Sequence, residues 1–125
     1  MRPQYISNVD LAKKLQLKPG QGLTAVGAPT SLAATLSELK GAGQAAEAAL
    51  LIFVTNQAAL EKHCATVVEC AANDRLTWVA YPKAGQLGTD LNRDSLAGIL
   101  IGHGIQPVRQ IALDDVWSAL RFRPG

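Results

Sequence analysis

The sequence contains few of the residues that cross-link small domains or hold metal ions. Its 125 residues include two cysteines, two histidines and one methionine. Cys64 and Cys70 fall six residues apart in one predicted helix, about 9 Å along its axis, which is too far for a disulfide bond. We therefore expect free thiols, no metal centre and a cytoplasmic location, where cysteines stay reduced.

Long apolar runs and blocks of like charge are also absent. No stretch of 18 apolar residues predicts a membrane span, and no secretory leader opens the chain. The net charge of +2 is small for a dedicated nucleic-acid-binding protein, so we expect neither membrane nor nucleic acid as a partner. The length fits one domain over residues 1–125, with residues 1–6 as a loose arm.

Hydrophobic residues are plentiful at 48%, and their spacing alternates between helical and extended periods along the chain. The helical segments predicted from this spacing are residues 9–17, 32–40, 57–72 and 95–102. The strands predicted are residues 23–27, 49–54, 76–81, a strand within 105–113 that starts after Pro107, and residues 116–123. Residues 44–48 are compatible with a loop, a helical turn or a weak edge strand.

This alternation predicts an α/β fold with a mostly parallel five-stranded sheet. The continuous apolar run at residues 49–54 is typical of a strand that is buried on both faces. Asp114 and Asp115 leave room only for a tight turn, so the last two strands should form an antiparallel hairpin. Right-handed crossovers should place successive helices on one face, leaving the other to residues 9–17. A face covered so incompletely would favour a homodimer.

Polar residues follow three of the predicted strands. Parallel sheets bind ligands at the carboxyl ends of their strands, where helix N-termini favour anions. The candidate ligand-binding residues are Gly27, Thr30, Ser31, Thr55, Asn56 and Lys83. The alternative is structural: Ser31 and Asn56 are ordinary helix caps, and Lys83 pairs with Asp90 across its own loop.

A second candidate surface lies in the predicted hairpin. Trp117, Arg121 and Arg123 share one face of the last strand, and Arg109 lies on the neighbouring strand. Tryptophan and arginine are enriched at protein interfaces, so these residues are candidates for contact with an acidic partner or nucleic acid. The alternative is a stacked arginine and tryptophan with no partner. Trp78 belongs to a central strand and is expected in the core.

The order of elements resembles the second half of the Rossmann-like methyltransferase fold, with strand order 1-4-5-7-6 in the nomenclature of that fold. A second resemblance covers most of the chain, to an uncharacterised bacterial family, domain of unknown function 3052. It is carried by LTWVAYPK at residues 76–83, TDL at 89–91, DVWSALRF at 115–122 and the Gly27-Ala28-Pro29 turn. This family implies a fold but no activity.

Two features of methyltransferases are missing from the sequence. Their G-x-G-x-G turn is matched here by Gly27 alone, and no acidic residue ends the next strand to hold a ribose. These absences favour a non-catalytic, regulatory or interaction domain with no cofactor and no catalytic residues. A binder of, or enzyme acting on, a small anionic or nucleotide-like ligand is the alternative, and a true S-adenosylmethionine-dependent methyltransferase is the third reading.

Overall fold

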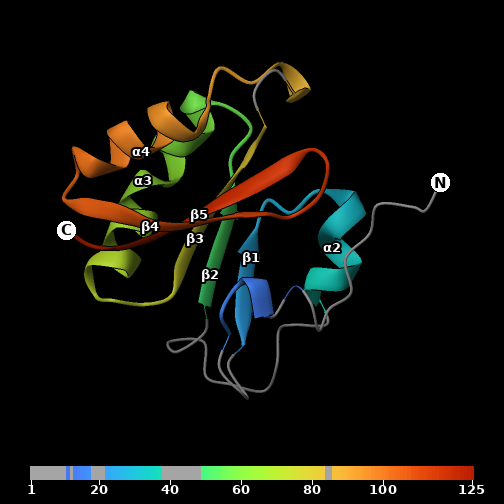
Figure 1. The fold of residues 1–125 in the computed structure, drawn as a ribbon, viewed down its shortest axis with the longest axis horizontal. Coiled ribbons are helices and arrows are strands. Elements are labelled where there is room, and N and C mark those ends of the chain that lie inside the picture. The colour runs from blue at the N-terminus through green and yellow to red at the C-terminus, as the bar shows by residue number, and fades with distance from the viewer. Residues whose placement is uncertain (1–10, 12, 18–21, 38–48, 84–85) are drawn as a thin grey trace.

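The fold is taken from a computed structural model, which describes residues 11, 13–17, 22–37, 49–83 and 86–125. Its elements are β1 (Leu23–Val26), α2 (Thr30–Ser37), β2 (Ala49–Phe53), α3 (Gln57–Ala72), β3 (Thr77–Pro82), a 3₁₀ turn η2 (Gln86–Gly88), α4 (Arg93–Ile101), β4 (Ile105–Ala112) and β5 (Trp117–Pro124). The α/β fold with a C-terminal hairpin is thus confirmed (Figure 1).

The five strands form one mixed sheet in the order β1-β2-β3-β5-β4. These labels number the strands in the order of this chain, whereas the expected order 1-4-5-7-6 uses the strand numbers of the methyltransferase fold. β1 pairs parallel with β2, and β2 with β3, but β5 runs antiparallel to both β3 and β4. The expectation of a mostly parallel sheet is therefore wrong, because the reversed strand lies inside the sheet and makes half of the pairings antiparallel.

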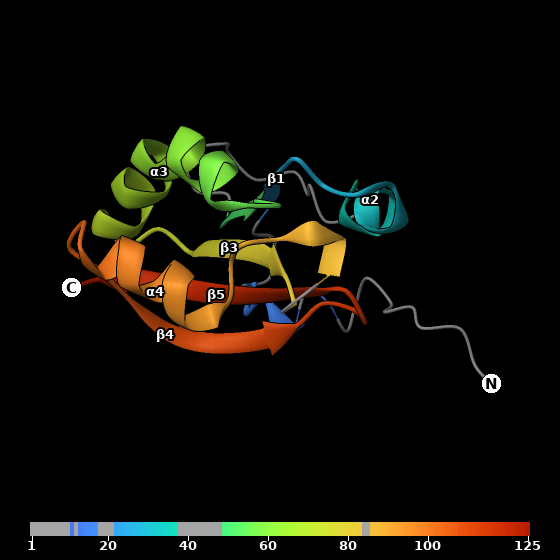
Figure 2. The ribbon, with the colours of Figure 1, turned by 90° about the horizontal axis from the view of Figure 1, so that it is seen from above.

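Helices lie on both faces of the sheet. The face that carries Ile52, Val79 and Phe122 packs under α3 and α4. The opposite face carries Leu51 and Trp78, and there the covering side chains come from α2 and from Leu11 and Leu15 of the N-terminal turn. Figure 2 shows the resulting layers, with α3 and α4 on one side of the sheet and α2 on the other. The prediction that successive helices share one face is wrong for α2.

The second face is better covered than the sequence predicts. Leu11, Leu15, Leu32 and Leu36 pack over it, and each is at most 5% exposed. The indole Nε1 of Trp78 donates a hydrogen bond of 3.0 Å to the carbonyl oxygen of Leu15, which ties the N-terminal turn to the central strand. The exposed apolar face that suggested a homodimer is therefore not found among the residues that the structure describes.

Element boundaries agree with the periodicity to within a few residues. α3 begins after Asn56 as predicted, and its two cysteines, Cys64 and Cys70, are free and buried. α4 begins two residues earlier than predicted, because Asn92 is its N-cap, and β4 begins at Ile105 rather than after Pro107. The predicted arm at residues 1–6 and the ambiguous segment 44–48 lie outside the described residues.

The turn of the β4–β5 hairpin is closed by one aspartate. Asp114 Oδ1 accepts hydrogen bonds from the backbone N–H groups of Val116 at 2.8 Å and Trp117 at 2.7 Å. Asp115 is exposed, with no such contact among the described residues. The predicted turn role of this pair is thus confirmed for Asp114, whose carboxylate satisfies two donors at the start of β5.

We expect Asp114→Ala to lower the free energy of unfolding by about 2 kcal/mol, because two charge-assisted hydrogen bonds are lost. Urea unfolding followed by circular dichroism measures this change. Asp115→Ala is the matched control, which removes the same charge from the same turn and should change stability by less than about 0.5 kcal/mol. Equal destabilisation by the two variants would contradict the capping role of Asp114.

Candidate functional site

The predicted ligand-binding residues follow the carboxyl ends of β1, β2 and β3, which are parallel neighbours and therefore end at one rim of the sheet. Thr55 and Asn56 are exposed beyond β2, and Asn56 Oδ1 caps α3 by accepting the N–H of Ala59 at 2.9 Å. Gly27 adopts a positive φ of 74°, and a Cβ at its position would lie 3.2 Å from the carbonyl oxygen of Phe53. Gly27 therefore provides close packing of β1 against β2, and Asn56 has the structural role that was the alternative.

The remaining predicted residues are divided between the two faces. Thr30 is the first residue of α2, which packs on the face opposite α3 and α4, and the side chain of Ser31 lies outside the described part of the structure. Lys83 follows β3 and is the one member of the predicted set that lines the cavity described next. The three strands end at one rim as predicted, but Thr30 and Asn56 begin helices on opposite faces and do not line this cavity, so a ligand site shared by Thr30, Asn56 and Lys83 stays a prediction.

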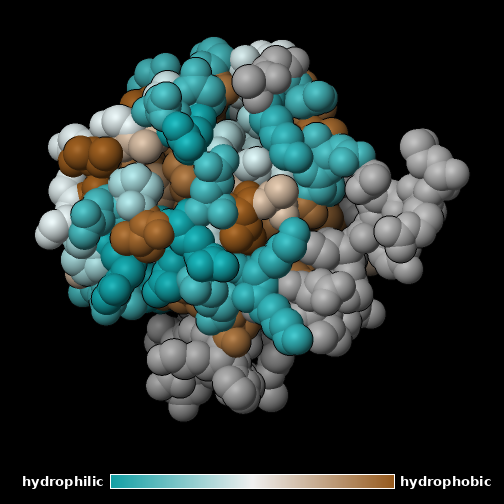
Figure 3. All heavy atoms as spheres, in the orientation of Figure 1, coloured by the Kyte–Doolittle hydropathy of each residue, from teal (hydrophilic) through white to brown (hydrophobic). Residues whose placement is uncertain are grey.

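An open cavity of about 540 Å³ lies between the β4–β5 hairpin and the start of α4. Its position is the edge of the sheet where β3 ends and β5 begins, which is where ligands bind in α/β folds. We call it the cleft, and define it by Tyr81, Lys83, Asn92, Arg93, Asp94, Gln110 and Ser118. Hydrophilic side chains cover much of the molecular face on which the hairpin lies (Figure 3).

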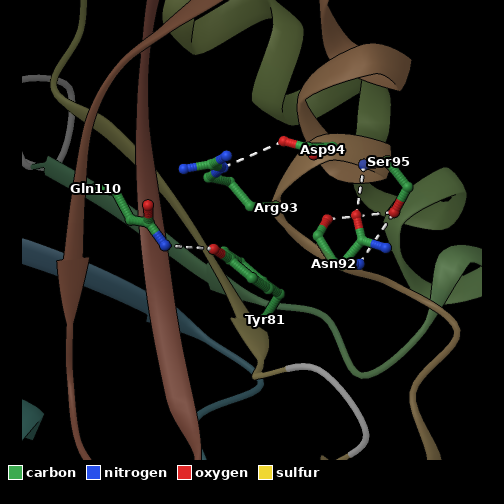
Figure 4. A network of polar contacts seen from close by, with 6 residues as sticks. All are labelled: Tyr81, Asn92, Arg93, Asp94, Ser95 and Gln110. Carbon is green, nitrogen blue, oxygen red and sulfur yellow. Dashed lines mark hydrogen bonds and ion pairs between the residues drawn. The ribbon is translucent and has the colours of Figure 1, made fainter.

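Neutral hydrogen-bonding groups form the sheet side of the cleft. Tyr81 on β3 pairs in register with Ser118 on β5, so their side chains project from the same face. The Nε2 of Gln110 on β4 donates a 3.0 Å hydrogen bond to the Tyr81 hydroxyl (Figure 4). The Tyr81 hydroxyl oxygen thus accepts a hydrogen bond from the Gln110 amide, and the hydroxyl proton can be donated to a ligand.

Burial keeps this phenol protonated. It raises the pKa of Tyr81 above the ordinary value of 10.0, and the charge of Asp94 acts in the same direction. The donors Gln110 and Ser118 and the positive charge of Arg93 oppose the rise in pKa without cancelling it. At neutral pH the cleft therefore presents a hydroxyl donor, and not a phenolate base.

Two cations form the other side of the cleft. Arg93 Nε lies 3.2 Å from Asp94 Oδ1, but both side chains are mostly exposed, so this ion pair is weak. The Lys83 side chain has no hydrogen bond or ion pair among the residues that the structure describes. The predicted pairing of Lys83 with Asp90 does not form, because Asp90 Oδ1 accepts the N–H of Gln57 at 2.8 Å instead.

A capping box fixes the helix that carries Arg93. Asn92 Oδ1 accepts the N–H of Ser95 at 2.9 Å, and Ser95 Oγ accepts the N–H of Asn92 at 3.0 Å. This reciprocal arrangement starts α4 at Arg93, whose guanidinium extends toward the side of the cleft that carries Gln110 in Figure 4. The partial positive charge of the helix N-terminus adds to the charges of the two cations.

The second predicted surface is only partly exposed. Trp117 is 5% exposed and packs edge-on against Phe53, with ring centroids 5.1 Å apart, so it is a core residue and the expectation that it binds a partner is wrong. Arg109 and Arg121 are paired in register on β4 and β5, and Arg123 follows on the same face. These three arginines therefore do lie together, on the face of the hairpin opposite Tyr81.

Sequence reasoning missed most of the cleft. Arg93 and Asp94 had a usable signal, since they follow the cap Asn92 directly and open a helix. Gln110 and Ser118 had none, because an isolated glutamine or serine in a predicted strand does not reveal which face it occupies.

Comparisons with known proteins identify no relative of this chain. No family model, curated protein or solved structure matches the chain. In the described residues, no three His, Cys, Asp or Glu side chains are grouped so that they could hold a metal ion. Within the same residues, no helix has the length and apolar character needed to span a bilayer.

The pKa of Tyr81 can be measured directly in a Tyr5→Phe background, where Tyr81 is the only tyrosine. We expect its tyrosinate absorbance in the folded protein to appear above pH 10.0. Because the folded-state pKa is raised, the corresponding stability is fully present below the unfolded-state pKa and is lost as the pH rises through the folded-state pKa.

Stability should therefore fall more steeply with alkaline pH in the Tyr5→Phe protein than in a Tyr5→Phe/Tyr81→Phe variant. Urea unfolding at several pH values measures both slopes. Titration of Tyr81 at or below its ordinary pKa in the folded protein would contradict the burial argument.

Proposed function

We propose that the protein is a non-catalytic ligand-binding domain that holds a small carboxylate or phosphate in the cleft. The observation that carries this proposal is the ammonium of Lys83, which has no partner among the described residues and lies in one open cavity with the guanidinium of Arg93. Among the cleft residues, the one negative charge is Asp94, so the site has a net charge of +1. An anion that lies against the two cations would complete the charge balance of the cleft.

The neutral residues define what else the ligand would carry. The Tyr81 hydroxyl and Ser118 are hydrogen-bond donors, while Gln110 supplies both a donor and an acceptor. A ligand with an anionic group and an adjacent hydroxyl or carbonyl would satisfy them. The lining residues include no histidine or cysteine, and the one carboxylate is already paired with Arg93. The cleft therefore has no base beside a nucleophile, which favours binding over catalysis.

The methyltransferase relationship and the family resemblance remain predictions beside this proposal. The antiparallel strand between β3 and β4 supports kinship with that fold. The site for the methionine end of the cofactor would lie at Gly27, whereas the cleft lies at the end of β3 and the start of β5. Ligand binding in the cleft does not depend on S-adenosylmethionine, so the two readings are separable by experiment.

Isothermal calorimetry and thermal unfolding with inorganic phosphate, succinate and S-adenosylmethionine test the proposal. We expect phosphate or succinate to raise the stability, by about 2.7 kcal/mol at 100 times its dissociation constant. Lys83→Gln and Arg93→Gln should each weaken binding by about tenfold, since each removes a charge-assisted hydrogen bond.

Lys62→Gln is the matched control, because Lys62 is an exposed cation on α3 outside the cleft. It should leave binding unchanged. Absence of any response to phosphate and succinate, or an equal loss in Lys62→Gln, would contradict the proposed site. Binding of S-adenosylmethionine that is insensitive to Lys83→Gln would instead favour the methyltransferase reading.

A further inference from the structure

Three arginines on the hairpin form a positive surface that the cleft does not use. We define the arginine strip as Arg109, Arg121 and Arg123, which project from the face of β4 and β5 opposite Tyr81. Arg109 lies directly across from Arg121 in the antiparallel register. Like charges directly opposite on paired strands destabilise a sheet, so this arrangement carries a cost in the isolated domain.

Among the residues that the structure describes, few groups compensate the positive charge of the strip. Arg123 forms a two-pronged ion pair with Asp74, with nitrogen–oxygen distances of 3.0 and 3.1 Å. Arg109 has no side-chain hydrogen bond or ion pair within the described part of the chain. Among the described residues, the carboxylate of Asp74 is thus ion-paired with Arg123 and acts at longer range on Arg121, whereas Arg109 has no such partner.

Arg121 lies between the other two arginines and is held by a neutral group. Its Nη1 donates a 2.6 Å hydrogen bond to Oε1 of Gln16, which follows the N-terminal turn. Its Nε is buried without a partner. Burial lowers the pKa of Arg121, the charges of Arg123 and Arg109 act in the same direction, and the charge of Asp74 opposes them without cancelling the effect.

We propose that the arginine strip docks an acidic segment of a partner protein, with two or more carboxylates along its chain. A single carboxylate on an exposed surface contributes little to binding, whereas several on one chain act together. The arginines occur at alternate positions of β5 and at the facing position of β4, which suits carboxylates spaced along an extended peptide.

The surroundings of the strip favour a polypeptide over nucleic acid. Single-stranded nucleic acid is held by exposed aromatic rings on which its bases stack. Trp78, Trp117, Tyr81, Phe53 and Phe122 are all buried, so the described residues offer no such platform. The net charge of +2 is also small for a surface that follows a phosphate backbone.

Fluorescence anisotropy with a labelled peptide of alternating glutamate and serine tests this surface. We expect binding at low ionic strength that weakens as salt is added, because the contacts are exposed charges. Arg109→Gln should weaken binding about fivefold, and Arg109→Gln/Arg121→Gln should abolish it. Lys62→Gln is the control for net charge and should bind like the unmodified protein.

Arg109→Gln is the informative variant because the Arg109 side chain has no hydrogen bond or ion pair to any described residue. The fold should therefore be retained, which circular dichroism can verify. Unchanged peptide binding by Arg109→Gln, or an equal loss in Lys62→Gln, would overturn the proposal. Equal binding of a labelled glutamine and serine peptide would also overturn it. Tighter binding of single-stranded oligothymidine than of the acidic peptide would reassign the strip to nucleic acid. None of these results depends on the cleft.

Discussion

The register of β5 against β3 is the constraint on which both candidate surfaces depend. It pairs Ser118 with Tyr81, whose side chains line the cleft, and Ala119 with Ala80, whose side chains pack in the core on the opposite face. A shift by one residue would turn Trp117 from its packing against Phe53 toward the opposite face. The Asp114 turn at the start of β5 fixes this register through two short hydrogen bonds, and the cleft therefore depends on a residue that does not line it.

Much of the fold was predictable because its signals are local or strongly periodic. The apolar run at residues 49–54 predicts β2, whose five residues are all buried because side chains pack on both faces of the strand. Asn56 and the apolar stripe after it predict α3 with its observed boundaries. The side of the sheet taken by α2 was not predictable, because it depends on the path of the chain from α2 to β2 and not on the residues of the helix.

The cleft was harder to predict than the fold because its position depends on pairing between distant strands. Lys83 was predicted as a site residue because the end of β3, which it follows, can be recognised in the sequence. Gln110 was not, because a bulge on β4 changes which residues face the cleft: Pro107 pairs with Phe122 and Arg109 with Arg121, which leaves Val108 as an extra residue. Alternation without the bulge would have placed Arg109 beside the cleft and Gln110 on the other face.

The same bulge explains why one hairpin carries two surfaces of different chemistry. Because of the bulge, the side chain of Gln110 projects toward Tyr81 and that of Arg109 projects into the arginine strip. The positive charge of Arg109 therefore lies on the face opposite the hydroxyls of the cleft. Bulges, prolines and exposed charges protect edge strands from pairing with other chains, and this accounts for Pro107, Val108 and Arg109 on β4. Edge protection does not account for Arg121, which lies on the inner strand with its Nε buried and unpaired. A cation in that position is unfavourable in the isolated domain, and an external carboxylate is the group that would offset its cost.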